Sequence, residues 1–278
     1  VLADDKKLQT VDNVIPAINA KAYTPALATA LDKVSAALTT DKLIALNRQT
    51  DLERKTSPNV AKQFVQSEGL ATGLSGGSGK IVIGAANFSE NQTLANIYAE
   101  TLNAAGFQAS VKTVGNRELY EPALEKGELQ VVPEYAGTLT EFLNKKQNGP
   151  NASAKASGDL NATVQALTAL GTKAGLKFGK PAEAADQNAF AVTKAFADKY
   201  GVSTLSDVAT KCPGGVTLGG PPECPQRPFC EPGLKDTYGI NITSFQSLDA
   251  GGPLSKTALR VGKVGMALVF SSDAVLGG

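Results

Sequence analysis

The sequence contains no histidine and no tryptophan, one methionine and three cysteines. Without histidine there is no Ser-His-Asp or Cys-His catalysis, no imidazole metal ligand and no histidine general base. Three cysteines alone do not provide the four soft or imidazole ligands of a structural zinc site. These classes of catalytic and metal site are therefore excluded. We expect no catalytic residues, no bound metal and no cofactor.

Excess charge and long apolar runs are also missing. The 27 Lys and Arg residues nearly balance 26 Asp and Glu, for a net charge of +1. This balance argues against a nucleic-acid partner, and no apolar run approaches the roughly 18 residues of a membrane span. The 278 residues suffice for one large domain or two of roughly 140 residues each. Since the first residue is not Met, we expect Val1 to be a processed or cut end.

The three cysteines leave one thiol over after any pairing. Cys224 and Cys230 frame the Pro-rich segment CPQRPFC, which lacks the Cys-x-x-Cys redox spacing. One interpretation is a structural disulfide, with Cys224 and Cys230 as the preferred pair, in an oxidising compartment. The alternative is that all three, including Cys212, are reduced and buried thiols.

Helix and strand patterns alternate along most of the chain. An apolar run at 14–18 precedes several helical patterns, among them one at 24–38, and a Gly/Ser-rich stretch at 71–79 is typical of a flexible linker. After it come a β-branched run at 80–88 and a helix at 89–106 that begins with an apparent capping box. This alternation predicts an α/β fold with mainly parallel sheets, arranged as two lobes.

Many segments resemble the ABC-transporter substrate-binding proteins of the glycine betaine/choline/carnitine/proline betaine class. The similar segments are 1–18, 33–51, 60–70, 83–102, 123–139, 188–209, 221–234, 237–240 and 248–273. The resemblance implies a type II periplasmic-binding-protein-like fold, in which each lobe is a sheet flanked by helices and the ligand cleft lies between the lobes.

The same resemblance implies a function. It indicates an extracytoplasmic solute-binding protein of an ABC importer, which binds a small zwitterionic or cationic solute by lobe closure. The implied partners are that solute and, for the parent protein, an ABC-transporter permease, with the binding protein itself a monomer. The implied location of the parent is periplasmic or, as a lipoprotein, anchored to the membrane.

The order of the segments differs from that of the family. Residues 1–70 resemble its final part, and the segment from residue 80 resembles its beginning. We expect a circular permutation in which residues 71–79 join the parent's ends and new ends open at Val1 and Gly278. The Gly/Ser linker favours an engineered, recombinant soluble protein over a natural permutation. The predicted lobes are 13–70 with 80–135, and 136–278 with 1–12, with crossings near Tyr135 and residues 10–14.

The resemblance implies a set of ligand-binding residues, most of which lie in or near turns that follow strands. Tyr135 and Phe190 would pack on the apolar part of the solute, and Arg117 would clamp a carboxylate or else pair with a nearby Glu. The full set is Ser89, Asn91, Arg117, Glu134, Tyr135, Thr138, Asn188, Phe190, Glu223, Arg227, Ser272 and Asp273. Ser89 and Asn91 could instead cap a helix, and Glu223 with Arg227 could form a structural ion pair.

The sequence departs from the family where a quaternary ammonium site is expected, and this leaves alternative functions open. A quaternary ammonium site needs electron-rich aromatic side chains, yet Leu254 and Pro253 stand where the family commonly has a Tyr. A solute whose carboxylate is bound by Arg117 fits the sequence equally well. Two other functions stay open: an engineered binding scaffold or sensor with altered specificity, and an enzyme that uses Glu134 and Asp273 as an acid/base pair.

Overall fold

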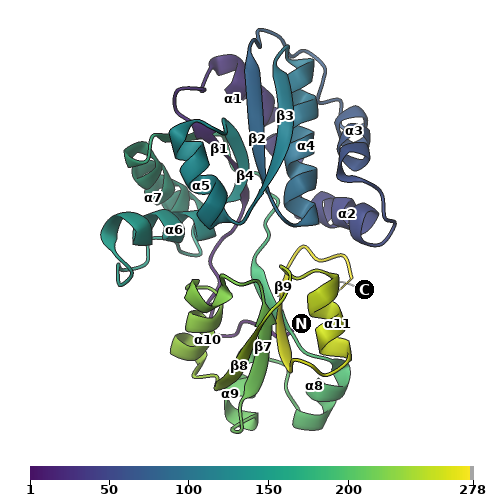
Figure 1. Ribbon diagram of the computed structural model, residues 1–278, viewed down its shortest axis with the longest axis vertical. Helices are drawn as coiled ribbons and strands as arrows, with labels where there is room; N and C mark the ends of the chain where they lie inside the picture. Colours follow the sequence, from purple (N-terminus) through teal and green to yellow (C-terminus); the bar gives the residue numbers. More distant parts are fainter. Residues whose placement is uncertain (276–278) are drawn as a thin grey trace. The chain divides into compact units, whose positions relative to one another are not determined.

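A computed structural model describes residues 1–275, and they fall into two compact units (Figure 1). The large unit is Val11–Asp186, and the small unit combines Val1–Thr10 with the described residues from Gln187 onward. Each unit has its own sheet and its own apolar core. The predicted α/β fold with two sheets flanked by helices is confirmed.

The large unit is built on a five-stranded sheet in the order β3-β2-β4-β1-β5. Strand β2 runs parallel to β3 and β4, whereas β1 is antiparallel to both β4 and β5. The strands are β1 Val14–Asn19, β2 Lys80–Ala86, β3 Gln108–Gly115, β4 Val131–Tyr135 and β5 Leu176–Phe178.

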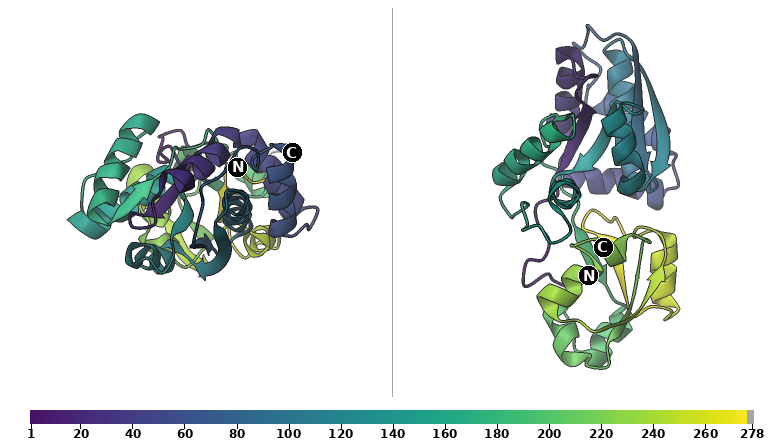
Figure 2. Two further views of the ribbon diagram at one scale, coloured as in Figure 1. Left: turned by 90° about the horizontal axis from the view of Figure 1, so that it is seen from above. Right: turned by 60° about the vertical axis from the view of Figure 1, so that its left-hand side comes forward.

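Helices cover both faces of this sheet, because alternate residues of its strands enter different apolar clusters. Val14 and Ile18 of β1 join a cluster with α1 to α4, and Ile15 joins a cluster with α5 to α7. Figure 2 shows the unit from two further directions. The helices are α1 Pro25–Ala37, α2 Thr40–Asp51, α3 Ser57–Ser67, α4 Ser89–Ala104, α5 Arg117–Lys126, α6 Ala136–Asn148 and α7 Leu160–Lys173.

The small unit is built on a four-stranded sheet in the order β6-β9-β7-β8, with β6 antiparallel to β9 and the others parallel. Leu2 donates its N–H to the Phe190 carbonyl at 2.8 Å and packs in the same core, which is why the first residues belong here. The elements are β6 Asn188–Ala191, α8 Lys194–Tyr200, α9 Leu205–Lys211, β7 Val216–Gly220, η1 Cys224–Gln226, α10 Glu231–Tyr238, β8 Ile242–Ser247, α11 Pro253–Arg260 and β9 Met266–Phe270.

The boundaries of the units differ in part from the predicted lobes. A division between Thr10 and Val11 agrees with the crossing expected near residues 10–14. The crossing expected near Tyr135 lies instead after Asp186, so residues 136–186 belong to the large unit. The physical reason is that β5 pairs with β1, and that α6 and α7 pack in one cluster with Ile15.

The segment predicted as a flexible linker lies against the large unit. Leu74 packs partly buried on the α1–α4 cluster, and Gly77 donates its N–H to the Ala105 carbonyl at 2.8 Å. A Cβ atom at Gly77 would stand 2.5 Å from the Phe107 ring, so glycine permits this close approach. The predicted cut between Gly278 and Val1 involves residues outside those described.

No helix among residues 1–275 is both long and apolar enough to cross a membrane. The predicted disulfide is confirmed: Cys224 and Cys230 are bonded, with their Cα atoms 5.2 Å apart. Cys212 is a buried free thiol. The disulfide closes the loop between β7 and α10.

Candidate functional site

The carboxyl edge of the large unit's sheet carries half of the predicted residues. Strands β2, β3 and β4 are parallel, so their carboxyl ends lie at one edge, where ligands commonly bind in α/β folds. Helices α4, α5 and α6 begin directly after these strands. The predicted residues in these three turns and helix starts are Ser89, Asn91, Arg117, Glu134, Tyr135 and Thr138.

Arg117 and Glu134 form a buried ion pair at this edge. Arg117 donates from Nε to Glu134 Oε1 at 2.9 Å and from Nη2 to Glu134 Oε2 at 2.7 Å, and Nη2 also donates to Thr138 Oγ1. The Tyr120 hydroxyl donates to Glu134 Oε1 at 2.6 Å. Burial disfavours the charged guanidinium, but the carboxylate of Glu134 more than compensates and holds the pKa of Arg117 well above its usual value.

This pairing differs from both sequence interpretations of Arg117. Its side chain is 5% exposed, and its fork of donors is directed at Glu134 and Thr138. The partner is Glu134, seventeen positions away, and not one of the neighbouring Glu residues considered from sequence.

Asp12 also joins the hydrogen bonds around Thr138, although it was not among the residues predicted from the sequence. Its Oδ1 accepts the Thr138 N–H at 2.9 Å, so it caps the first turn of α6 from a distant part of the chain. The Asp12 carbonyl accepts the N–H of Asp186, which joins the two ends of the large unit. Desolvation raises the pKa of the buried Asp12 carboxyl to about 7.

An aromatic pair lies at the same edge. The rings of Phe88 and Tyr135 are stacked, with centroids 6.3 Å apart. Tyr135 donates its hydroxyl to Glu90 Oε1 at 2.7 Å, and Asn47 donates to Glu90 Oε2 at 2.7 Å. Phe88 is half-buried, and Tyr135 is 6% exposed. Burial, followed by the nearby Glu90 carboxylate, raises the pKa of Tyr135 well above its usual value.

Buried charge at this edge is mainly negative. Four buried carboxyl groups, those of Asp12, Glu90, Glu134 and Asp186, lie around Tyr135 and the start of α6. Among the described residues, Arg117 is the one buried basic side chain, and Glu134 already pairs with it. Acidic side chains therefore outnumber basic ones among the buried residues of this edge.

The other two predicted residues of this unit have structural contacts. Asn91 is fully buried, accepts the Ala86 N–H at 2.7 Å and donates to the Pro133 carbonyl at 2.9 Å, so it ties β2 to β4. Ser89 donates its hydroxyl to Asp51. The expected capping box is wrong, because Phe88 is the N-cap residue of α4 and makes no side-chain capping bond.

In the small unit, five of the six predicted residues lie around one edge of the sheet. Strands β7, β8 and β9 are parallel, and Asn188 at the start of β6 pairs with Phe270 at the end of β9. Asn188 donates to the Phe229 carbonyl at 3.1 Å. The other four follow β7 or β9 in sequence: Glu223, Arg227, Ser272 and Asp273.

Ion pairs engage the charged residues of this edge. Arg227 and Glu223 are 3.5 Å apart, which is the structural pair considered from sequence. Asp273 pairs with Lys256 at 2.7 Å, a partner that the sequence did not indicate. Arg117 likewise pairs with Glu134, the other carboxylate of the acid/base pair considered above.

Phe190 does not line an edge. Its side chain is 1% exposed and lies in the core of the small unit with Leu2 and Leu218. Leu2 also lies beside it in the backbone, since the Leu2 N–H bonds to the Phe190 carbonyl. Its predicted contact with the solute is therefore not supported.

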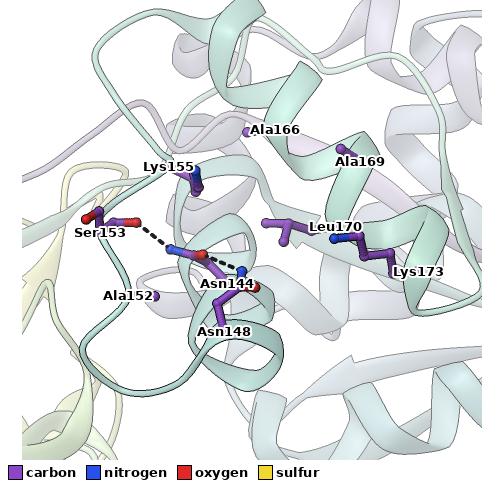
Figure 3. A pocket seen from close by; sticks show the side chains of 9 residues that line it. All are labelled: Asn144, Asn148, Ala152, Ser153, Lys155, Ala166, Ala169, Leu170 and Lys173. Atoms are coloured by element: carbon purple, nitrogen blue, oxygen red, sulfur yellow. Dashed lines mark hydrogen bonds between the residues drawn. The ribbon is translucent and has the colours of Figure 1, made fainter.

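Two hollows lie away from these residues. One of about 580 Å³ is formed by α6, α7 and the loop between them, and includes Asn144, Lys155 and Leu170 (Figure 3). Another of about 360 Å³ in the small unit includes Phe196, Thr217 and Thr243. Neither is lined by a predicted site residue. Within residues 1–275 there is no group of three side chains suited to a metal ion.

Residues 1–67 and 79–277 match the family described as the substrate-binding domain of ABC-type glycine betaine transport systems (OpuAC). The chain belongs to this family. Its members are binding components of transporters, which is a class distinct from enzymes. The match leaves out residues 68–78, most of the Gly/Ser-rich stretch.

Individual relatives are distant. The chain is 28% identical over 188 residues to a glycine-betaine-binding protein from Pseudomonas aeruginosa, covering 64% of this chain and 57% of that protein. It thus spans a little over half the length of this relative. A crystal structure of a glycine betaine/carnitine/choline ABC transporter is 22% identical, with a TM-score of 0.42, over 69% of this chain and 68% of that one.

Proposed function

We propose that the chain is an extracytoplasmic solute-binding protein of an ABC importer and that its solute carries a quaternary ammonium group. The observation that carries this proposal is the edge of the large unit, where the Phe88–Tyr135 pair lies among four buried carboxyl groups. Aromatic faces attract cations, and buried negative charge adds to that attraction.

The contacts of Arg117 favour this solute class over one recognised mainly by its carboxylate. Glu134 accepts two hydrogen bonds from the guanidinium, so binding a solute carboxylate there would require breaking a buried ion pair. Asn188 and Arg227 of the small unit remain proposed solute contacts, as do Ser272 and Asp273. Solute capture by lobe closure also stays a prediction.

A thermal-shift screen tests the proposed solute class. We expect choline, glycine betaine, carnitine or proline betaine to raise the melting temperature, because a specific ligand stabilises the folded state by mass action. Acetate and proline serve as controls for carboxylate and amino-acid binding. A shift with acetate or proline alone would contradict the proposal.

A substitution at the aromatic pair gives a second test. Phe88→Ala should weaken binding of a quaternary ammonium solute by roughly threefold to thirtyfold, the worth of one cation–aromatic contact. Tyr200→Ala is the matched control, because Tyr200 is an exposed aromatic residue of the small unit. Equal affinities of the two variants would remove Phe88 from the site.

We also propose that the chain is circularly permuted, with the Gly/Ser-rich stretch joining the parent's ends. The family match leaves out residues 68–78, which include most of the proposed joint. A variant returned to the family's order should fold and bind its solute as this chain does. A variant in family order that fails to fold would contradict the proposed rearrangement. The alternative proposal for the function is an engineered binding scaffold or sensor with altered ligand specificity.

The proposed partner is an ABC-transporter permease, and the proposed location is extracytoplasmic. The family supports both, and the Cys224–Cys230 disulfide suits an oxidising compartment. Binding of the solute-loaded protein to its permease in detergent or nanodiscs would test the partnership.

A further inference from the structure

A chain of hydrogen bonds leads from α2 to the aromatic pair. Asn47 of α2 donates to Glu90 Oε2 at 2.7 Å, and Tyr135 donates to Glu90 Oε1 at 2.7 Å. Asn47, Glu90 and Tyr135 are all buried. Glu90 lies in the first turn of α4, where the helix dipole favours a carboxylate.

The carboxylate has two effects on the tyrosine. A charge-assisted hydrogen bond fixes the direction of the hydroxyl and so the plane of the ring. It also shifts electron density from the hydroxyl into the ring, which makes the ring face more negative. Because both groups are buried, little solvent screens the effect. A more negative face attracts a cation more strongly.

The other buried carboxyl groups do not make this contact. Glu134 accepts from Arg117 and from the Tyr120 hydroxyl, and its contact with Tyr135 is to the backbone N–H. Asp12 accepts from Thr138, and Asp186 acts on Tyr135 as a nearby charge. Glu90 is therefore the group that acts on the ring of Tyr135 through its hydroxyl.

We propose that Glu90 is a positioning residue that orients and polarises the Tyr135 ring and so selects a cationic solute over a neutral one of the same shape. This inference rests on the proposed function, which concerns the class of solute, and adds the residue that sets its charge selectivity. It assigns no direct contact between Glu90 and the solute.

Pairs of solutes that differ only in charge test the inference. Choline has 3,3-dimethylbutan-1-ol as its counterpart without the ammonium charge. Glycine betaine has 3,3-dimethylbutanoate, an anion in which an uncharged carbon replaces the ammonium nitrogen. Affinities would be measured by calorimetry, with competition for the weaker member of each pair. The ratio of the two affinities isolates the contribution of the ammonium charge.

The variants are Glu90→Gln, which keeps the shape and an acceptor, and Tyr135→Phe, which keeps the ring without its hydroxyl. Each should lower the charged-to-neutral affinity ratio by roughly threefold to tenfold, within the range of a partly desolvated cation–aromatic contact. Glu128→Gln is the control, because it removes an exposed negative charge from the same unit and should leave the ratio unchanged.

The outcomes are distinguishable. If wild type shows the expected ratio but both variants keep it, or weaken both solutes equally, the inference is overturned while the proposed function stands. If wild type binds none of the quaternary ammonium solutes, the proposed function fails and this inference fails with it. Should Glu90→Gln not fold, Glu90→Asp takes its place, because the shorter side chain withdraws the carboxylate from the Tyr135 hydroxyl and should lower the ratio likewise.

Discussion

Removing the guanidinium of Arg117 should destabilise the protein far more than removing an exposed cation. The Arg117→Met substitution leaves the buried Glu134 carboxylate with the Tyr120 hydroxyl and the Tyr135 N–H, but without a compensating charge. Breaking a buried ion pair from one side costs about 3–5 kcal/mol. An exposed pair four residues apart on a helix contributes only about 0.3–0.5 kcal/mol.

Urea unfolding followed by far-ultraviolet circular dichroism measures the free energy of unfolding. The control is Lys194→Met, which breaks a pair with Asp198 whose side chains are 87% and 65% exposed. A double variant, Arg117→Met with Glu134→Leu, removes both charges and should recover much of the loss. A loss below about 1 kcal/mol for Arg117→Met would refute the conclusion that burial makes this pair important.

Two further predictions concern pH and the disulfide. Because the folded-state pKa of Asp12 is about 7 against an ordinary 3.8, the free energy of unfolding should fall as the pH rises from about 4 to about 7, and Asp12→Asn should remove that part of the fall in urea titrations at each pH. Identical pH profiles for wild type and variant would contradict this. Replacing Cys224 and Cys230 by Ser should lower the free energy of unfolding by about 2 kcal/mol, since the bond closes a short loop, whereas Cys212→Ser should leave reductant sensitivity unchanged.

The sequence predicted the local structure well where local chemistry determines it. The helical pattern predicted at 24–38 is α1, and Thr24 caps it by accepting the Leu27 N–H. The preferred pairing of Cys224 with Cys230 is also confirmed, over the alternative of three reduced thiols. These features depend on residues that are close in the chain.

Contacts between residues that are far apart in the chain could not be predicted from local sequence patterns. Asp12 and Asn47 reach the carboxyl edge through the topology of β1 and α2, and no local pattern marks either residue. The partner of Arg117 depends on how the α5 start lies beside the end of β4. Membership of residues 136–186 in the large unit depends on the pairing of β5 with β1.

Calorimetric titration of the protein with choline and glycine betaine tests the central claim most directly. The account predicts saturable binding of at least one of them with one solute per chain and no chemical turnover. Titrations in which neither solute binds, while a carboxylate lacking an ammonium group does, would contradict it.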